Sequence, residues 1–373
     1  MGLPGCRIIN ISCIHLGTNF CKSFQLFGEE LGGGDGVLGE FEDDSDEELT
    51  EVPAEEITST MSAGDDNGLL DMNLPAHFRC ASHRLNNVAT TDVLAANDDF
   101  DFKRKSRNAH SKCTALLNKQ GRSSQASDNV REVCGKLFER PNDTRWNSHH
   151  RAMNGIKEAI DKSDDNLNGL MDKLGLPWFT EENITFIQEY CEVFEPFATT
   201  LDILQREKNC FIGMLLPLLA HLEAELVSAA QKVDICQPLA QALLDGIAKR
   251  FDSEFTKDNF YIAAFLIPRF KDSWVFSSEK RDYIWGKIKA EVVKESGPSV
   301  PSVQRVVEKK KDPLDRLFPL GEMTQTADDY LEAYKSAPRG DVEQLTRYPP
   351  LDVLFRKYNS PLSSSASVER LFR

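Results

Sequence analysis

The chain has 373 residues, of which 40% are hydrophobic, so it is long enough for one large or two medium domains with a buried core. Its formal net charge of −15 excludes a surface that is basic throughout. The acidity is concentrated in residues 29–71, which contain sixteen of the 59 Asp and Glu residues and no Lys or Arg. The other 330 residues therefore carry 43 acidic and 44 basic side chains and are close to neutral.

The cysteines and the apolar runs of the sequence indicate in which cellular compartment the protein is expected. The nine cysteines are an odd number without regular spacing, which predicts reduced thiols, as in the cytosol or nucleus. The N-terminal residues lack the long apolar run of a signal peptide. The most apolar run, residues 211–220, has only ten residues and includes Gly213 and Pro217, so we expect no membrane partner.

The first residues predict one α/β unit. Residues 7–14 are rich in β-branched side chains that roughly alternate with others, which is typical of a strand. Gly17 ends this strand, and Phe20, Phe24 and Phe27 follow at helical spacing. A strand, a glycine turn and a helix are the building unit of an α/β layer.

The acidic residues 29–73 begin with a glycine-rich run and contain few aromatic side chains. Such a composition buries too little apolar surface to offset the entropy of ordering, so we expect this segment to be disordered. A solvated linker is one interpretation, and an acidic segment that binds a partner is the other.

Residues 74–89 have apolar and small side chains at the spacing of a buried helix. Cys80 and His83 lie three positions apart and share a face of that helix. Two such ligands do not make a zinc site, which needs three or four. We therefore predict packing roles for both residues, no metal site and no cofactor.

Residues 103–122 contain seven basic side chains and no acid. This stretch predicts a face that contacts phosphate groups, or a nuclear import signal in residues 103–107, or simply a solvated helix face. The seven basic residues are Lys103, Arg104, Lys105, Arg107, Lys112, Lys119 and Arg122.

A long helical region follows. Asp143 or Thr144 is a suitable N-cap, and an apolar stripe begins at Trp146, whose spacing alone favours a place in the core. Three or four helices are expected between residues 178 and 255, with an interruption near Pro196. The stripe that begins at Trp146 continues with Met153, Ile156 and Ile160.

The C-terminal stretch predicts two short helices separated by Pro361. Pro349 and Pro350 suit a helix start. Helices this short and apolar are not stable alone, so they pack on an earlier part of the chain, on a second copy, or on both. The first helix carries Leu351, Leu354, Phe355 and Tyr358 on one stripe, and the second carries Val368, Leu371 and Phe372.

Several of these motifs resemble those of hAT-type transposases. The resemblance covers Gly17–Phe20, the Arg-Cys-x-x-His run that ends at His83, Thr144–Ser148 and, most densely, Tyr348–Phe372. It implies an α/β, mostly helical fold: an incomplete RNase H-like core with an all-α insertion domain. The implied parts are residues 1–28 as a residual strand–helix unit, 29–73 as the acidic segment, 74–140 as a helical junction with the basic stretch, 141–294 as the insertion domain, 295–326 as a linker and 327–373 as the dimerisation region.

The resemblance also bears on catalysis. hAT transposases cut DNA with three carboxylates that hold two divalent metal ions. Glu369 matches the third acid, His15 stands where the second is expected, and the first falls outside the chain, which is shortened at both ends relative to the family. We therefore expect a catalytically inactive, transposon-derived protein; the alternative is an active metal-dependent transposase or nuclease.

The resemblance further implies that Trp146 stacks on a base flipped out of DNA, since an aromatic face stabilises an unstacked base by roughly 1–3 kcal/mol. The expected protein is nuclear and forms a homodimer through its C-terminal region. Residual affinity for double-stranded DNA is one interpretation, and a protein-binding scaffold without DNA contact is the other. The predicted DNA-binding residues are Trp146, Arg145, Lys103, Arg104, Lys105 and Arg107.

Overall fold

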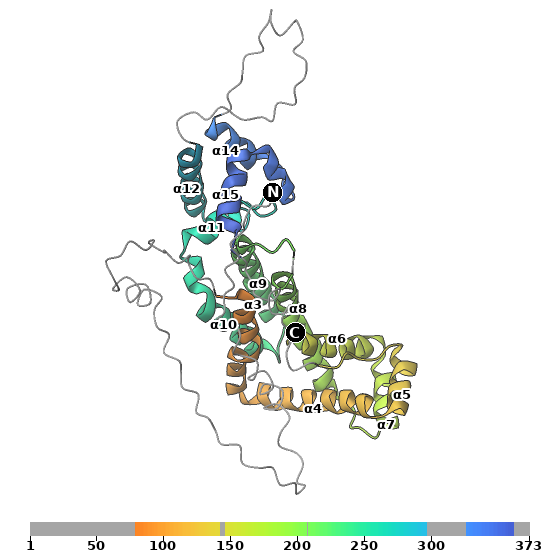
Figure 1. The fold of residues 1–373 in the computed structure, drawn as a ribbon. Helices are drawn as coiled ribbons and strands as arrows, with labels where there is room; N and C mark the ends of the chain where they lie inside the picture. The colour runs from red at the N-terminus through yellow and green to blue at the C-terminus, as the bar shows by residue number, and fades with distance from the viewer. Residues whose placement is uncertain (1–78, 142–145, 207, 297–325, 362–373) are drawn as a thin grey trace, which may run out of the picture. The chain divides into compact units, whose positions relative to one another are not determined.

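The computed structural model describes residues 79–141, 146–206, 208–296 and 326–361. Contacts divide the chain into one unit of residues 1–28 and 80–373 and another of residues 29–79, of which only Arg79 is described. Within the first unit, the described residues form helices and contain no strand (Figure 1). This confirms the mostly helical prediction, whereas the predicted strand at 7–14 and the acidic segment lie outside the described residues.

The helices follow one another with short connections. In chain order they are α3 (Ala81–Thr90), η2 (Asp92–Asp98), α4 (Phe100–Arg122), α5 (Ser124–Cys134), α6 (Trp146–Lys162), α7 (Asp164–Lys173), α8 (Glu181–Leu204), η3 (Ile212–Met214), α9 (Leu215–Ala230), α10 (Gln237–Phe255), α11 (Asp258–Phe265), α12 (Ser278–Ser296), α14 (Ala327–Ser336), η4 (Val342–Arg347) and α15 (Pro349–Asn359).

Capping side chains account for several helix starts. Asp99 accepts a hydrogen bond from the first turn of α4, and Ser123 does the same for α5. Reciprocal capping boxes open α8 at Thr180 and α14 at Thr326. The predicted caps of α6, Asp143 and Thr144, lie outside the described residues.

Helix α8 is central to the core. It packs on α6, α9 and α4, and its Phe186, Phe194 and Phe197 are fully buried. The predicted interruption near Pro196 is wrong, because α8 continues through this proline. Both halves of the helix bury aromatic side chains, and this packing outweighs the roughly 3 kcal/mol that an interior proline costs.

The first described helices are joined to α10 by two bidentate ion pairs. Arg84 of α3 donates to the carboxylate of Glu254 at 2.5 and 3.2 Å, and Arg250 of α10 pairs in the same way with Asp92. The side chains of both pairs are mostly shielded from solvent, so dissolved salt screens their attraction less than that of surface ion pairs. The described part of the predicted junction, residues 79–140, thus packs directly on the predicted insertion domain.

One stretch of helix, Ile212–Ala230, is long and apolar enough by length and composition to span a membrane. Half of it is buried within the protein, where its leucines contribute to the contacts of α9 with α8 and α10. A core helix passes the same test of length and composition, so this feature is weak support for a membrane span.

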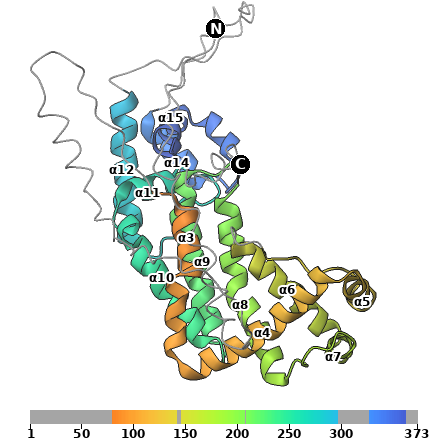
Figure 2. The ribbon, with the colours of Figure 1, turned by 60° about the horizontal axis from the view of Figure 1, so that its bottom comes forward.

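The C-terminal helices pack against the middle of the chain. Helix α15 contacts η3, α11 and α12, while α14 contacts α12 (Figure 2). Pro349 and Pro350 occupy the first turn of α15, as predicted, and the helix ends at Asn359. The second predicted C-terminal helix lies outside the described residues.

Candidate nucleic-acid and self-association surfaces

The predicted basic stretch forms most of helix α4. Its inner side is buried through Phe102, His110, Leu116 and other residues, which leaves the basic side chains on the outer side and along the two edges. The basic side chains of α4 therefore lie away from the hydrophobic core. An import signal read as an extended peptide would require the first turns of α4, including the buried Ser106, to unwind.

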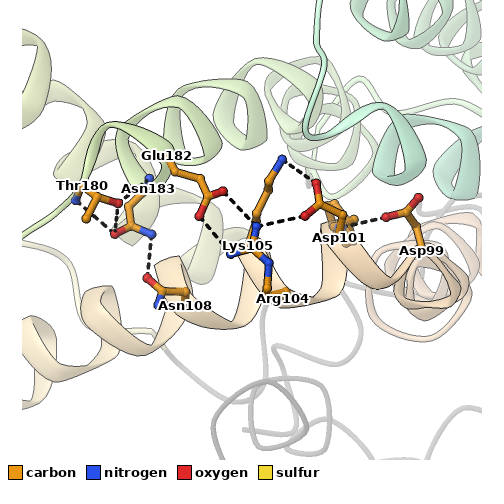
Figure 3. A network of polar contacts seen from close by, with 9 residues as sticks. Asp99, Asp101, Arg104, Lys105, Asn108, Thr180, Glu182 and Asn183 are labelled. Atoms are coloured by element: carbon orange, nitrogen blue, oxygen red, sulfur yellow. Dashed lines mark hydrogen bonds and ion pairs between the residues drawn. The ribbon is translucent and has the colours of Figure 1, made fainter.

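Two of the predicted DNA-binding residues are held by acids. Arg104 pairs with Asp101 at 2.9 Å and with Glu182 of α8 at 3.0 Å, and Lys105 pairs with Asp101 at 2.6 Å (Figure 3). The hydrogen bond from Lys105 is the main reason that the pKa of Asp101 is lowered. Arg104 thus connects α4 with the N-terminus of α8, whereas Lys105 pairs within α4, and part of the charge of both is neutralised.

Lys112 belongs to the same polar seam between α4 and α8. Its ammonium group donates to the carbonyl of Trp178 at 2.6 Å and to the side chain of Asn183 at 2.5 Å. Asn183 in turn donates to Asn108 of α4 at 2.8 Å (Figure 3). Lys112 therefore acts as a structural contact rather than an open phosphate ligand.

The remaining cations of α4 have no ion pair among the described residues. Arg107, Lys119 and Arg122 are exposed, whereas Lys103 is half-buried. The guanidinium group of Arg140 lies against Gly121, where an added Cβ would be 2.8 Å from its central carbon. We call Arg107, Lys119, Arg122 and Arg140 the α4 outer cations.

Trp146 lies in the hydrophobic core and not at the surface. Only 5% of it is exposed, and its ring contacts Phe194 and Phe197 with centroid separations of 4.5 and 5.4 Å. A stacked imidazole, that of His150, covers it at 5.8 Å. The ring has no open face for a flipped base in this arrangement, so the core interpretation fits and the base-stacking role does not. Arg145 lies outside the described residues.

The residues after Trp146 are buried as well. Asn147 donates to Asp202 of α8 at 2.6 Å, and Ser148 is buried beside it in the chain. The imidazole of His150 lies 3.6 Å from the carboxylate of Glu195, and burial lowers the pKa of His150. This part of the Thr-Arg-Trp-Asn-Ser motif therefore forms a contact between α6 and α8.

The predicted dimerisation stripe on α15 packs inside its own chain. Leu351 and Leu354 are fully buried, Phe355 is 7% exposed, and Tyr358 is half-buried. The ring of Phe355 meets Phe211 edge-on with a centroid separation of 5.1 Å. Of the two partners that the sequence left open, an earlier part of the chain is the one observed within the single chain that the structure describes. Val368, Leu371 and Phe372 lie outside the described residues.

A buried amide fixes the end of α15. The side-chain carbonyl of Asn359 accepts a hydrogen bond from the backbone of Gly213, and its amide group donates to the carbonyl of Ala263, both at 3.0 Å. Gly213 has no room for a side chain, because an added Cβ would clash with the backbone of Ala263. This glycine allows the close approach that brings the three residues together.

A buried lysine receives the end of α14. The ammonium group of Lys271 donates to the carbonyls of Tyr334, at 2.6 Å, and of Ala337. The last carbonyls of a helix have no partner within the helix, and a cation is favoured there. Tyr334 itself is fully buried and donates to the carbonyl of Phe265 at 3.0 Å.

Ion pairs surround this apolar contact. Lys357 of α15 pairs with Glu291 and Glu295 of α12 at 2.8 Å each, and Lys289 pairs with Asp328 at 2.7 Å. The hydrogen bond to Glu291 is the main cause of the raised pKa of Lys357. These pairs are partly exposed, so each contributes little to stability but adds to the register of the contact.

No group of three or more His, Cys, Asp or Glu side chains among the described residues is arranged to hold a metal ion. His83 is exposed and Cys80 is half-buried. His15 and Glu369, the positions that match catalytic acids of the hAT family, lie outside the described residues.

Comparison with known proteins adds no relative. A scan against models of protein families finds no match, and a search of curated proteins finds no similar chain. The resemblance to hAT transposases therefore rests on the short sequence motifs. Sequence reasoning missed Lys271 and Asn359, although the Pro-Arg-Phe-Lys run that ends at Lys271 was a visible signal.

Proposed function

We propose that this chain is a helical, catalytically inactive protein derived from a hAT transposase, and that it works in the nucleus by associating with a second copy through its C-terminal region. The observation that carries the proposal is the construction of residues 326–361. The two short helices α14 and α15 bury apolar side chains and pack on other helices of the chain through non-covalent contacts. An interaction module binds its partner in the same way.

Sedimentation of protein that has been unfolded and then refolded at each of a range of concentrations tests self-association. We expect a shift from monomer to dimer at roughly micromolar concentrations or above, a range that is typical of transient protein contacts. The same experiment on a chain that ends before residue 326 is the comparison. A full-length protein that stays monomeric at every concentration would exclude the proposed function.

The finer fold proposal is an incomplete RNase H-like core, to which residues 7–27 would contribute a strand and a helix. Lack of activity follows from the sequence match, since His15 cannot supply the carboxylate oxygen that Mg²⁺ or Mn²⁺ prefers. Incubation with a DNA end substrate and Mn²⁺ should leave the strands intact. Metal-dependent cleavage that is abolished by Glu369→Ala would instead identify an active nuclease.

A second candidate function is binding of double-stranded DNA, and the α4 outer cations favour it. Arg107, Lys119 and Arg122 extend along one helix without an acid between positions 103 and 122. Their charges are open to phosphate groups, in contrast to those of Arg104 and Lys105. Binding of a duplex measured against salt concentration should give a linear log–log dependence, whose slope reports the number of phosphates contacted.

A further inference from the structure

The C-terminal helices make their contacts with one limited stretch of the chain. We call residues 326–361 the C-terminal unit, and η3, α11 and α12 with residues 266–271 its docking site. The hydrogen bonds, ion pairs and ring contacts that the C-terminal unit makes with the rest of the described chain go to residues 211–295. The C-terminal unit therefore binds to one continuous region of the sequence, residues 211–295.

We propose that the docking site also accepts the C-terminal unit of a second copy of this chain, so that the dimer forms by exchange of this unit. The inference rests on the proposed self-association and states its mechanism. It also explains why the stripe predicted for dimerisation is buried within one chain: the same side chains, Leu351, Leu354 and Phe355, would make the same contacts in the dimer.

The covalent path allows this exchange. Residues 297–325 connect α12 to the C-terminal unit, and these 29 residues can span roughly 95 Å when fully extended. Such a distance exceeds the size of a docking site built from a few short helices. A docking site thus has no geometric means to distinguish the C-terminal unit of its own chain from that of another copy.

The chemistry of the docking site identifies the occupant as a copy of this chain. Lys271 is placed to cap a helix whose last turn contains a buried tyrosine, Tyr334, and the backbone of Lys271 has a φ of +47°, in the left-handed region. Gly213 and Ala263 present one donor and one acceptor that match a single amide side chain. A foreign helix would leave these buried groups without partners, whereas a second copy satisfies each of them.

Mass action sets the conditions under which exchange is seen. Docking within one chain benefits from a local concentration in the millimolar range, which favours monomers in dilute solution. Reciprocal exchange keeps every docking contact. Dimer formation is therefore opposed only by the translational and rotational freedom that two chains lose when they associate. Undocking must first expose buried residues such as Tyr334 and Leu354, so we expect exchange to be slow in native buffer and fast after unfolding.

The test uses full-length protein in unlabelled and heavy-isotope forms. The two forms are mixed, unfolded together, refolded at high concentration and separated into monomer and dimer. A zero-length carbodiimide reagent then links ion pairs that join the C-terminal unit to its docking site, Lys357 with Glu291 and Lys289 with Asp328. Mass spectrometry shows whether the two linked peptides come from one isotopic form or from both.

Exchange predicts mixed-isotope links in the dimer, at the level of random pairing, and only same-isotope links in the monomer. A dimer that contains only same-isotope links would overturn exchange and leave self-association standing. The absence of any dimer would overturn both. Asn359→Ala should reduce linking in monomer and dimer alike, whereas Arg356→Ala, on the exposed side of α15, should leave it unchanged.

Discussion

On α4, the cations expected to bind DNA lie at the surface, where Asp101 and Glu182 hold some of them and others have no ion pair within the described residues. On α15, three of the apolar side chains expected to bind a second copy, Leu351, Leu354 and Phe355, are buried within their own chain. The difference follows from solvation. A surface charge remains well hydrated without a protein partner, whereas an apolar stripe lowers its free energy only by leaving water.

The two regions therefore differ in what a mutation does. A change on the outer side of α4 should alter binding and leave stability almost untouched. A change under α15 should alter stability first and association as a consequence. Four experiments test this contrast, in order of decreasing expected effect.

Leu354→Ala should have the largest effect. Leu354 is fully buried on α15, which packs on η3, α11 and α12, so truncation removes apolar contacts and leaves a cavity. We expect a loss of about 2–5 kcal/mol in the free energy of unfolding, measured by urea denaturation. Val353→Ala is the matched control, because Val353 is the preceding residue and is 51% exposed. Equal losses in the two variants would show that α15 is not docked as described.

Acid should destabilise the protein through the inner side of α4. Burial lowers the pKa of His110 from 6.5 to about 4, and its ring packs between Phe186 and Tyr190. The unfolded chain therefore binds a proton more readily than the folded one. The stability contributed by neutral His110 is complete above pH 6.5 and is lost as the pH falls toward 4, by roughly 3 kcal/mol.

Urea denaturation at several pH values between 4 and 7 measures this loss, with His110→Leu as the comparison. The imidazole faces Ser106 on its own helix, and His149 is the nearby titratable group whose charge opposes its protonation. The variant should show a flatter dependence of unfolding free energy on pH. An unchanged dependence would mean that another group is responsible.

Asn359→Ala should cost about 1–3 kcal/mol of unfolding free energy, because the buried N–H of Gly213 and carbonyl of Ala263 lose their partners. Ser360→Ala, one residue further and exposed, is the control. Hydrogen exchange adds a second readout: amides of α15 should exchange faster in Asn359→Ala, while those of α8 stay protected. A uniform change across the protein would argue against a locally docked C-terminal unit.

Local sequence patterns were enough for much of the helical architecture. The stripe from Trp146 to Ile160 is buried as its spacing predicts, and two prolines open α15. The core interpretation of Trp146 also came from spacing, whereas the base-stacking role came from the family resemblance. Spacing reports which side of a helix is apolar, and this property is decided within a few turns of chain.

Contacts between distant residues could not be predicted in this way. Lys271 caps a helix that begins 56 positions later. Its backbone is left-handed, a conformation that a lysine in the sequence does not predict. Pro196 failed as a helix breaker because its neighbours Phe194 and Phe197 are buried and pack on Trp146 of α6. Whether α15 binds its own chain depends on the fit of Gly213, Ala263 and Asn359, which are far apart in sequence.

The smallest effects are expected on the outer side of α4, in DNA binding. Arg107→Ala removes an exposed cation that has no ion pair among the described residues. If it contacts a phosphate, the slope of log affinity against log salt should become shallower by about 1. Arg104→Ala should change the slope less, because Asp101 and Glu182 already neutralise part of its charge.

Glu182→Gln sharpens this last comparison, since it removes one of the two acids that pair with Arg104, leaves Asp101 in place and removes no cation from α4. The salt dependence should then become steeper than in the unmodified protein, and a second change, Arg104→Ala, should cancel the gain. Unfolding free energy should differ little among these variants, because a partly exposed ion pair contributes about 0–1 kcal/mol. Identical slopes for all of them would mean that α4 does not contact DNA and that its charge serves only to hold α8.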